Sequence, residues 1–290
     1  MKVTFWGVRG SFPVSTPTSI RYGGNTPCTE VTAGDTTLLI DAGTGIRAAG
    51  HSLLERGIAD VHILLGHPHW DHIQGFPHFP LLDQGGASIA IHSLHREDRE
   101  LREIFAAQQR PPFYPVQLEE ARADISFVEH SEGEPFQAGE ATVVCRRLNH
   151  PGVAGGFRIE HAGAAFAYIC DADIYGDLLL ADGLPVSSEA DKEHWLEELR
   201  NRARDLGHRA DLLVCDTFFL PEEYQPDWGH SRPDDAIRLG LLAEARCVGL
   251  FHHRPGREDD HMDALLERYR TQVNGEIELM ATREGLEVTL

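Results

Sequence analysis

The sequence lacks the features that mark membrane proteins and disulfide-stapled proteins. No stretch approaches the uninterrupted run of about 18 apolar residues that a membrane-spanning helix requires. The five cysteines are odd in number and dispersed, and no two of them form a Cys-x-x-Cys pair. This pattern excludes a disulfide framework and a thiolate zinc knuckle. The first residues are typical of a strand and lack the long apolar region of a signal peptide, so we expect a cytoplasmic protein without a membrane partner.

Positive charge is scarce as well. Lysine and arginine number 26 against 46 aspartates and glutamates, so the formal net charge is −20. A surface this acidic repels polyanions, which makes a nucleic-acid polymer an unfavourable partner. The chain shows no internal repeat and no low-complexity segment, and its 41% hydrophobic and 25% charged residues are typical of a globular protein.

What the chain does have is an alternation of strands and helices. Apolar runs bounded by turn residues predict two short terminal strands and, before them, strands at 2–8, 27–33, 36–41, 61–66, 140–148, 155–161, 164–170, 211–216 and 246–251. Helical spacing predicts helices at 45–56, 97–109, 188–206, 232–243 and about 258–273. Three prolines between 110 and 115 predict a loop. The pattern indicates a layered α/β fold with sheet faces packed together and helices outside.

The chain also has 17 histidines, and the spacing of some of them indicates a metal site. Residues 67–72 read His-Pro-His-Trp-Asp-His and directly follow a predicted buried strand. Residues two apart in an extended chain share a side, so His67 and His69 can bind one ion together. Asp71 and His72 follow after the chain turns and can face a second position. Imidazoles and carboxylates suit zinc by default, and manganese or iron could use the same ligands.

Further candidate ligands follow later predicted strands. His150, Asp171 and His252 each come at or just after the end of such a strand, and strand ends at one sheet edge converge in space. We therefore expect one ion to be held by His67, His69 and His150. We expect the other to be held by Asp71, His72 and His252, with Asp171 bridging both. Asp173 and His253 are neighbouring alternatives, and Asp171 is preferred to Asp173 because it directly ends its apolar run.

With these residues the sequence resembles the metallo-β-lactamase-fold hydrolases. The residues at 67, 69, 71, 72, 150, 171 and 252 match the order of the dinuclear ligands in that superfamily, which favours His252 over His253. Gly229-His230-Ser231, preceded by Asp216, is most similar to the phosphodiesterase branch that includes ribonuclease Z and class II cyclic-nucleotide phosphodiesterases. In ribonuclease Z-like enzymes such a histidine touches the scissile phosphate and an upstream carboxylate orients it. The resemblance implies these roles for His230 and Asp216.

The resemblance also implies a fold and further contacts. It implies a four-layer αββα sandwich formed by one domain over 1–290, with insertions at 93–136 and 174–210, and a homodimer. The family uses the early loop near its pocket, so Asn25 is a candidate substrate contact, and a plain turn is the alternative interpretation. Ser231 is a second candidate because it adjoins the proposed catalytic histidine. Tyr114 could stack on a nucleobase, or it could form a hydrophobic or dimer contact.

These expectations combine into one function. Two divalent ions would lower the pKa of a shared water to near neutrality and so provide a bridging hydroxide nucleophile. Asp71 could accept the proton of the nucleophile, and His230 could stabilise the phosphoryl oxygens or protonate the leaving alkoxide. No arm for holding transfer RNA is evident, and the net charge fits an RNA substrate poorly. We therefore expect a phosphodiesterase that acts on a small diester, above all a cyclic nucleotide.

Three alternatives remain open. The same two ions could hydrolyse a carboxylic substrate such as a lactone, thioester or β-lactam, although such a substrate needs no phosphate-facing histidine. The chain could also be an RNA-processing ribonuclease. A metal-stabilised binding protein without turnover is the third alternative, and the presence of all seven ligands argues against it.

Overall fold

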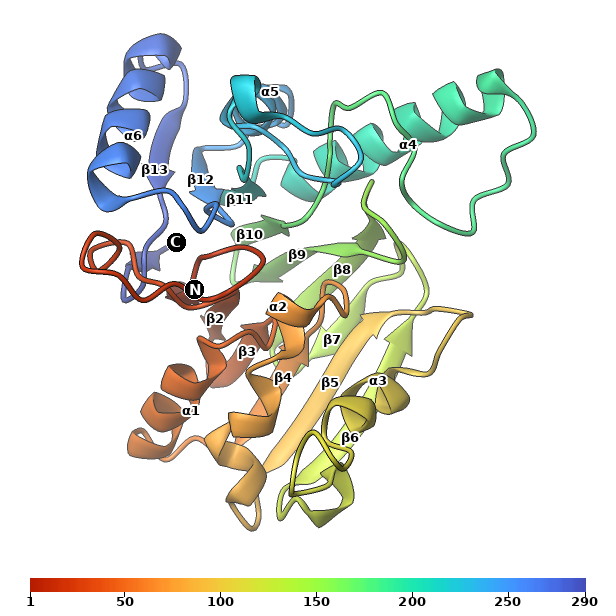
Figure 1. Ribbon diagram of the computed structural model, residues 1–290, viewed down its shortest axis with the longest axis vertical. Coiled ribbons are helices and arrows are strands. Elements are labelled where there is room, and N and C mark those ends of the chain that lie inside the picture. The colour runs from red at the N-terminus through yellow and green to blue at the C-terminus, as the bar shows by residue number, and fades with distance from the viewer.

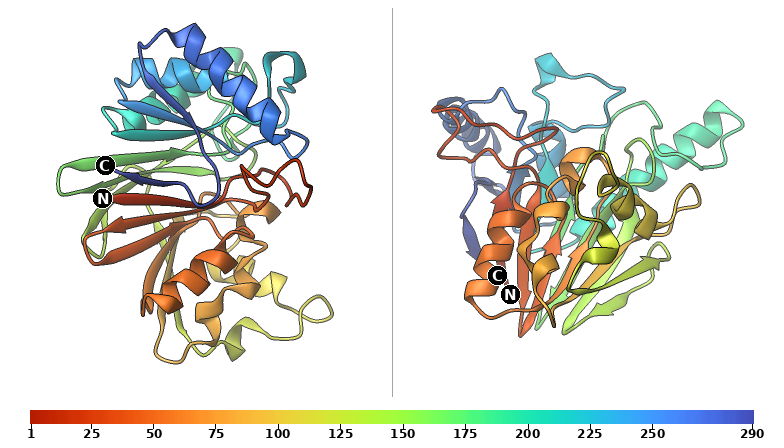
Figure 2. Two further views of the ribbon diagram at one scale, coloured as in Figure 1. Left: turned by 90° about the vertical axis from the view of Figure 1, so that its left-hand side faces the viewer. Right: turned by 60° about the horizontal axis from the view of Figure 1, so that its bottom comes forward.

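Two seven-stranded sheets lie face to face between two layers of helices in the computed structural model, which describes residues 1–290 (Figures 1 and 2). In the left view of Figure 2 the four layers follow one another from top to bottom as helix, sheet, sheet and helix. The expected four-layer αββα arrangement is confirmed. None of the helices combines the length and the apolar character needed to cross a membrane.

The first sheet has the strand order β14-β1-β2-β3-β4-β5-β6. Its strands are β1 Lys2–Gly7, β2 Cys28–Ala33, β3 Thr36–Ile40, β4 Asp60–Leu64, β5 Ser88–Leu94, β6 Asp124–His130 and β14 Glu287–Thr289. The outer side of this sheet is covered by α1 Ile46–Glu55, α2 Trp70–Ile73 and α3 Leu101–Gln108. β14 pairs with β1, so the two ends of the chain lie side by side.

The second sheet has the strand order β13-β12-β11-β10-β9-β8-β7. Its strands are β7 Phe136–Ala138, β8 Ala141–Arg147, β9 Gly155–His161, β10 Ala164–Ile169, β11 Leu212–Asp216, β12 Cys247–Phe251 and β13 Glu278–Ala281. The helices on this side are α4 Glu189–Gly207, α5 Pro233–Leu242 and α6 Asp259–Val273. They pack against β8–β10, β11–β12 and β13, respectively.

Alternating side chains in the strands build the layers. In β4, Val61 and Ile63 face the helices, whereas Leu64 faces the second sheet. The three apolar layers contain 25, 22 and 22 buried residues. Each large apolar side chain that is fully buried contributes about 1.5–3 kcal/mol relative to exposure. Both faces of each sheet are therefore covered by apolar packing, and polar groups are found at the strand ends.

Strand direction brings the ends of both sheets to one edge. β3 to β6 run parallel to one another, and so do β10 to β13. β8 is antiparallel to β9, which is antiparallel to β10, so β8 points the same way as β10. The loops that follow β4, β8, β10, β11 and β12 therefore meet at the same edge of the sandwich, and this edge carries the candidate site.

The structure also contains elements that sequence patterns did not predict. β5, β6, β7 and the single-turn helix α2 were missed. β6 is an edge strand whose residues are mostly half-buried or exposed, so its apolar signal is weak. The expected loop at 110–115 is confirmed. β6 and α4 lie within the two segments expected to be insertions and form part of the sheet and helix layers, and their status as insertions stays a prediction.

Candidate metal centre

The chain after β4 brings the first candidate ligands to the sheet edge. His67 is buried in this loop, and His69 is the exposed residue that precedes α2. Asp71 and His72 lie on the single turn of α2, which is closed by a hydrogen bond from the His72 backbone N–H to the His69 carbonyl. The extended segment followed by a turn therefore aims the two pairs of side chains at different positions, as the spacing predicted.

Asp171, which follows β10, lies between two groups of imidazoles. Its Oδ2 is 3.6 Å from His67 Nε2 and 3.9 Å from His150 Nε2. His150 Nε2 is in turn 3.1 Å from His69 Nδ1. The ligand atoms of these four side chains all lie within 4.8 Å of one another. They form the first of the two groups that the sequence predicted.

The second group faces the other oxygen of the same carboxylate. Asp171 Oδ1 is 3.2 Å from His72 Nε2 and 3.1 Å from His252 Nε2. Asp71 Oδ2 is 3.2 Å from His252 Nε2 and 3.5 Å from His72 Nε2. The two oxygens of Asp171 thus point to different groups, which is the arrangement of a bridging carboxylate.

The donor atoms fit divalent metal ions. Two ligand atoms that are each about 2.1 Å from a tetrahedral zinc ion are about 3.4 Å apart, and the N···O separations at Asp171 span 3.1 to 3.9 Å. His67 Nε2 and His72 Nε2 are buried without a hydrogen-bond partner, which costs about 1–3 kcal/mol for a buried polar atom that nothing binds. The cluster is therefore able to bind metal.

The electrostatics of the two groups differ. Burial lowers the pKa of His150 to about 4 and holds the pKa of His67 well below its usual value, so both imidazoles present free lone pairs. Burial acts in the same direction on His252, but the carboxylates of Asp171, Asp216 and Asp71 outweigh it and raise the pKa of His252 to about 10. The second group is thus a negative site that stabilises a cation.

Asp41 fixes the orientation of one candidate ligand from behind. Its Oδ2 is 2.8 Å from His72 Nδ1 and accepts a 2.8 Å hydrogen bond from the Tyr168 hydroxyl, and its Oδ1 accepts a 2.9 Å hydrogen bond from the backbone N–H of Gly66. Asp41 is fully buried at the end of β3. Since the carboxylate accepts the proton at Nδ1 of His72, Nε2 keeps its lone pair and faces Asp171.

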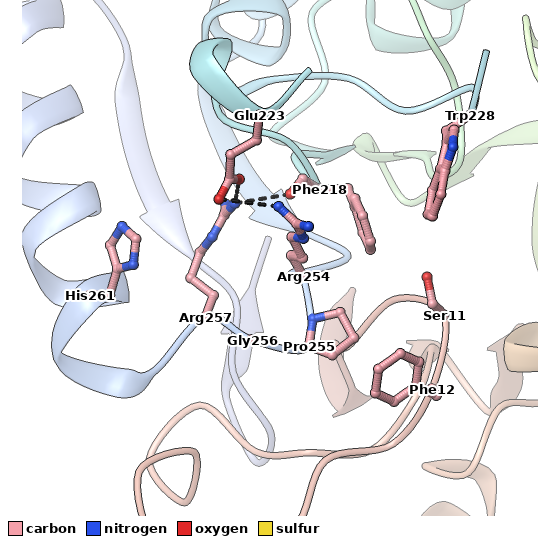
Figure 3. Close-up of a pocket in the computed structure, with 10 residues that line it drawn as sticks. All are labelled: Ser11, Phe12, Phe218, Glu223, Trp228, Arg254, Pro255, Gly256, Arg257 and His261. Atoms are coloured by element: carbon pink, nitrogen blue, oxygen red, sulfur yellow. Dashed lines mark hydrogen bonds and ion pairs between the residues drawn. The ribbon is translucent and has the colours of Figure 1, made fainter. Parts of the chain in front are cut away.

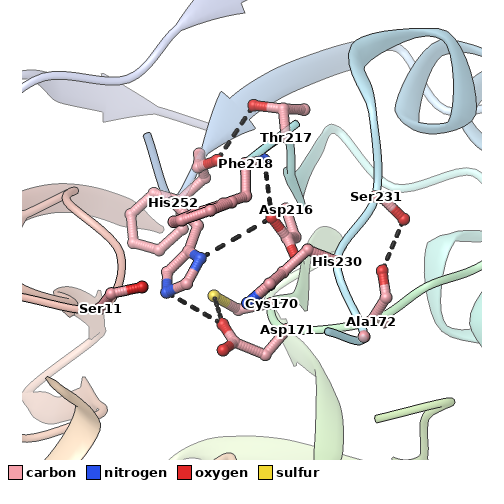
Figure 4. Close-up of polar contacts among 12 residues, drawn as sticks. Ser11, Cys170, Asp171, Ala172, Asp216, Thr217, Phe218, His230, Ser231 and His252 are labelled. Atoms are coloured by element: carbon pink, nitrogen blue, oxygen red, sulfur yellow. Dashed lines mark hydrogen bonds and ion pairs between the residues drawn. The ribbon is translucent and has the colours of Figure 1, made fainter. Parts of the chain in front are cut away.

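A histidine–carboxylate pair adjoins the cluster (Figure 4). His230 Nδ1 is 2.8 Å from Oδ2 of Asp216, the last residue of β11. Asp216 Oδ1 accepts the backbone N–H of Phe218 at 2.9 Å, and the Phe218 ring stacks on the imidazole with centroids 4.7 Å apart. A ring nitrogen of His230 lies within 4.8 Å of the ligand atoms of Asp171 and His252. The pair is held rigidly beside the bridging carboxylate.

The backbone at these strand ends is left-handed. Asp171 and His252 have φ values of 50° and 58°, and Ser11 has 64°. Non-glycine residues rarely adopt this conformation, which concentrates at functional sites. The Ser11 turn donates its backbone N–H to Asp71 Oδ2 at 2.7 Å. Gly10 before it lies so close to His252 that an added Cβ would come within 2.5 Å of the imidazole.

The two neighbouring alternatives have other partners. Asp173 Oδ2 accepts a 2.5 Å hydrogen bond from the Tyr224 hydroxyl, and burial raises the pKa of Asp173 to about 6. His253 Nε2 is 2.8 Å from the carbonyl oxygen of Thr282, and its ring lies against Tyr22. Both side chains point away from the cluster.

Cys170 was missed as part of the site. Its apolar strand suggested a small buried hydrophobe, and the thiol is indeed buried. Burial raises the pKa of the thiol well above its usual value, so it stays protonated and donates to Asp171 Oδ1 at 2.9 Å. No local sequence signal distinguishes this contact, because it depends only on the turn after β10.

The three expected substrate contacts have hydrogen-bond partners within the chain. Both polar atoms of the Asn25 amide are bonded to neighbouring side chains of the same chain. The Ser231 hydroxyl is fully buried and donates to a backbone carbonyl at 2.5 Å. The Tyr114 hydroxyl donates to a backbone carbonyl at 2.7 Å. A contact of these residues with a substrate, including stacking on the Tyr114 ring, stays a prediction.

Three other histidines form a separate chain between the sheets. His62 Nδ1 is 3.0 Å from His92 Nε2, and His92 Nδ1 is 2.9 Å from His130 Nε2. Phe136 stacks on the His130 ring with centroids 3.5 Å apart. Burial and, to a smaller extent, the two neighbouring imidazoles lower the pKa of His92 to about 3. These three side chains bond to one another and are not among the candidate metal ligands.

Comparisons with known proteins give the family. A family model described as a beta-lactamase superfamily domain matches residues 36–186. An uncharacterised protein of Mycobacterium tuberculosis is 32% identical over 264 residues, which cover 87% of this chain and 81% of that protein. A diphosphatase from the PhnP family has a TM-score of 0.65 at 17% identity over 100% of this chain and 97% of its own. The short form of human tRNase Z has a TM-score of 0.64 at 18% identity over 100% of this chain and 99% of its own.

Proposed function

Because the chain belongs to the beta-lactamase superfamily, we propose that it is a metal-dependent hydrolase that cleaves a small phosphodiester. The observation that carries this proposal is the pairing of His230 with Asp216 beside Asp171, at 2.8 Å between Nδ1 and Oδ2. A buried carboxylate that orients an imidazole gives the site a directed proton donor where a phosphoryl group would lie. The similarity of the fold to a diphosphatase and to tRNase Z supports phosphorus chemistry.

Two ions would be held by the two groups of side chains described above. One group comprises His67, His69, His150 and Asp171, and the other comprises Asp71, His72, Asp171 and His252. Bound there, divalent ions supply Lewis acidity toward a phosphoryl oxygen and lower the pKa of a water molecule. We propose zinc as the ion, because five of the seven side chains are histidines and imidazole nitrogens are typical zinc ligands.

The protein groups act on the substrate in distinct ways. Asp216 accepts the proton at Nδ1 of His230. In the imidazolium form, Nε2 also carries a proton, which it donates to a phosphoryl oxygen or to the departing alkoxide. Stacking of Phe218 holds the imidazole plane in place. Asp71 Oδ2 accepts the Ser11 backbone N–H and lies 3.2 Å from His252 Nε2. Asp71 is the candidate acceptor for the proton of the attacking water.

The charge of the chain favours a small substrate over RNA. With a net charge of −20, repulsion grows with every phosphate that a polymer brings to the surface. A small diester carries only one such charge, and salt screens its repulsion from distant carboxylates. A cyclic nucleotide meets these conditions, and we propose it as the substrate. Cytoplasmic location and homodimer formation stay predictions.

The experiment is a substrate panel on zinc-reconstituted protein. The panel contains bis(p-nitrophenyl) phosphate, 3′,5′- and 2′,3′-cyclic nucleotides, a short RNA, a lactone, a thioester and nitrocefin. We expect turnover of the small diesters and a loss of about 100-fold or more in kcat when His230 is replaced by glutamine. His51→Gln, an exposed change on α1, is the matched control. Turnover of the lactone, thioester or nitrocefin without the diesters would overturn the proposal, and turnover of RNA alone would move it to RNA processing.

A further inference from the structure

A cavity of about 520 Å³ opens beside the candidate metal centre (Figure 3). This volume is in the range of small-molecule sites. Two residues belong both to the cavity and to the centre. Ser11 lines the cavity and binds Asp71 through its backbone N–H, and Phe218 lines the cavity and stacks on His230. A substrate whose phosphate lies at the centre therefore has this cavity next to it.

Two aromatic side chains at the cavity are only partly covered by the rest of the protein. Phe12 is 59% exposed and Trp228 is 50% exposed. They come from opposite parts of the chain, the loop after β1 and the loop after β11, and Figure 3 shows them on two sides of the opening with the Phe218 ring near Trp228. Large aromatic surfaces that stay exposed at the rim of a cavity are typical of ligand sites, where a planar ring can stack on them.

The cavity also carries a small positive charge, although the chain as a whole is acidic. Its charged residues are Arg254, Arg257 and Glu223, which sum to one positive charge in a chain whose net charge is −20. Arg257 is buried and bonded to Glu223 at 2.7 Å. Arg254 is partly exposed and pairs with the same carboxylate at 3.2 Å. Since the carboxylate is shared, Arg254 retains N–H donors and charge for a ligand.

The walls of the cavity are fixed from behind. Arg9 is completely buried and donates to the carbonyl oxygens of Gly23 at 2.8 Å and of Arg257 at 2.7 Å. These bonds join the loop that carries Phe12 to the segment that carries Arg254. A cavity held in this way is formed before the ligand arrives, which reduces the entropy that binding costs.

We propose that this cavity is the subsite for the nucleobase of the substrate. A planar nitrogen heterocycle lies between Phe12 and Trp228, and Arg254 donates to acceptor atoms of the ligand and attracts its negative charge. The inference rests on the proposed function, because it assumes that the phosphate of a nucleotide lies at the metal centre. It adds the residues that select the organic part of the diester.

The test measures binding by calorimetry on zinc-loaded protein with two probes, adenosine 5′-monophosphate and ribose 5-phosphate. The probes share the phosphate and differ in the base. Stacking of a base on aromatic side chains predicts that the nucleotide binds about tenfold or more tightly than the sugar phosphate. Phe12→Leu and Trp228→Leu should bring this ratio toward one, whereas Trp228→Phe, which keeps a ring, should preserve it.

A spectroscopic readout and two further variants sharpen the result. The nucleotide should quench tryptophan fluorescence in the unmodified protein, and this quenching should disappear in Trp228→Phe although the affinity remains. Trp195→Leu on α4, remote from the cavity, is the control for loss of a tryptophan. Trp70 and Phe113 line a different cavity of about 570 Å³. If the ratio of nucleotide affinity to sugar-phosphate affinity fell in Trp70→Leu and not in Trp228→Leu, the assignment would be overturned.

Failure of this inference is distinguishable from failure of the proposed function. Equal binding of the two probes, no measurable binding of either, or a ratio unchanged in both leucine variants would overturn the subsite. Hydrolysis of bis(p-nitrophenyl) phosphate by the same zinc-loaded preparations reports separately on the diesterase activity. Loss of the base preference in Trp228→Leu, together with hydrolysis of that diester by the unmodified protein, is the result that we expect.

Discussion

Replacing Asp41 by asparagine removes a charge that holds the candidate ligand His72 in place, and it changes no candidate ligand atom. The carboxylate accepts three hydrogen bonds, from the Gly66 N–H at one oxygen and from His72 Nδ1 and the Tyr168 hydroxyl at the other. An asparagine amide has one acceptor and one donor end. In either orientation, the amide NH₂ of the asparagine therefore faces a group that is itself a hydrogen-bond donor.

The cost of this mismatch can be estimated for both orientations. If the amide nitrogen faces His72, the imidazole must move its proton to Nε2, the atom that faces Asp171 at 3.2 Å, and it can then no longer bind metal. If the nitrogen faces Gly66, a buried N–H loses its acceptor, which costs about 1–3 kcal/mol. Loss of the group that orients a ligating histidine typically reduces metal affinity by about 10–100-fold, and about 1.4–2.8 kcal/mol corresponds to this range.

The assay is a competition for zinc between the protein and a chromophoric chelator. We expect Asp41→Asn to weaken the binding of one zinc equivalent by about 10–100-fold and to leave the other equivalent less affected. The matched control is Asp259→Asn, because Asp259 is also buried and accepts two backbone N–H groups but lies near Tyr22, away from the ligands. If Asp41→Asn bound both equivalents as tightly as the unmodified chain, the role assigned to Asp41 would be refuted.

Two further predictions concern stability and the shape of the site. Burial lowers the pKa of His92 to about 3 in the folded chain against about 6.5 unfolded, so folding is favoured above pH 6.5 and stability is lost as the pH falls below it. The free energy of unfolding, measured with urea, should fall between pH 7 and pH 5 by about 2 kcal/mol more in the unmodified chain than in His92→Gln. The control His51→Gln should behave like the unmodified chain, and an equal fall in all three proteins would contradict this prediction. Gly10→Ala should displace His252 and weaken zinc binding by about tenfold. Gly256→Ala should leave zinc binding unchanged, because nothing lies within 4 Å of its new methyl group. Equal zinc affinities of the two variants would argue against the close fit of Gly10 to His252.

Much of the metal centre was predictable because its ligands follow strands with clear apolar patterns. His67, Asp171 and His252 each come directly after a buried run, and the direction of parallel strands sends such residues to one edge. The pairing of His230 with Asp216 was predictable only through the family resemblance, since 14 positions separate them and no local pattern joins them.

The rest depended on contacts between distant parts of the chain. The cavity joins Phe12, Trp228 and Arg254 from three loops, and none of these loops has a repeating pattern that indicates its neighbours. β6 was missed because an edge strand keeps polar residues on its exposed positions. The internal hydrogen bonds of Asn25 and Ser231 were equally invisible in the sequence, because their partners lie far away along the chain.

We propose that two metal ions and the His230–Asp216 pair together hydrolyse a phosphodiester. To test this, the protein is stripped with a chelator and zinc is titrated back while the hydrolysis of bis(p-nitrophenyl) phosphate and of a 3′,5′-cyclic nucleotide is followed. We expect activity to rise to a plateau at two equivalents of zinc per chain and to be lost in Asp171→Asn, whose carboxylate faces both groups of candidate ligands. A plateau at one equivalent, or fully metal-loaded protein that cleaves no diester, would contradict it.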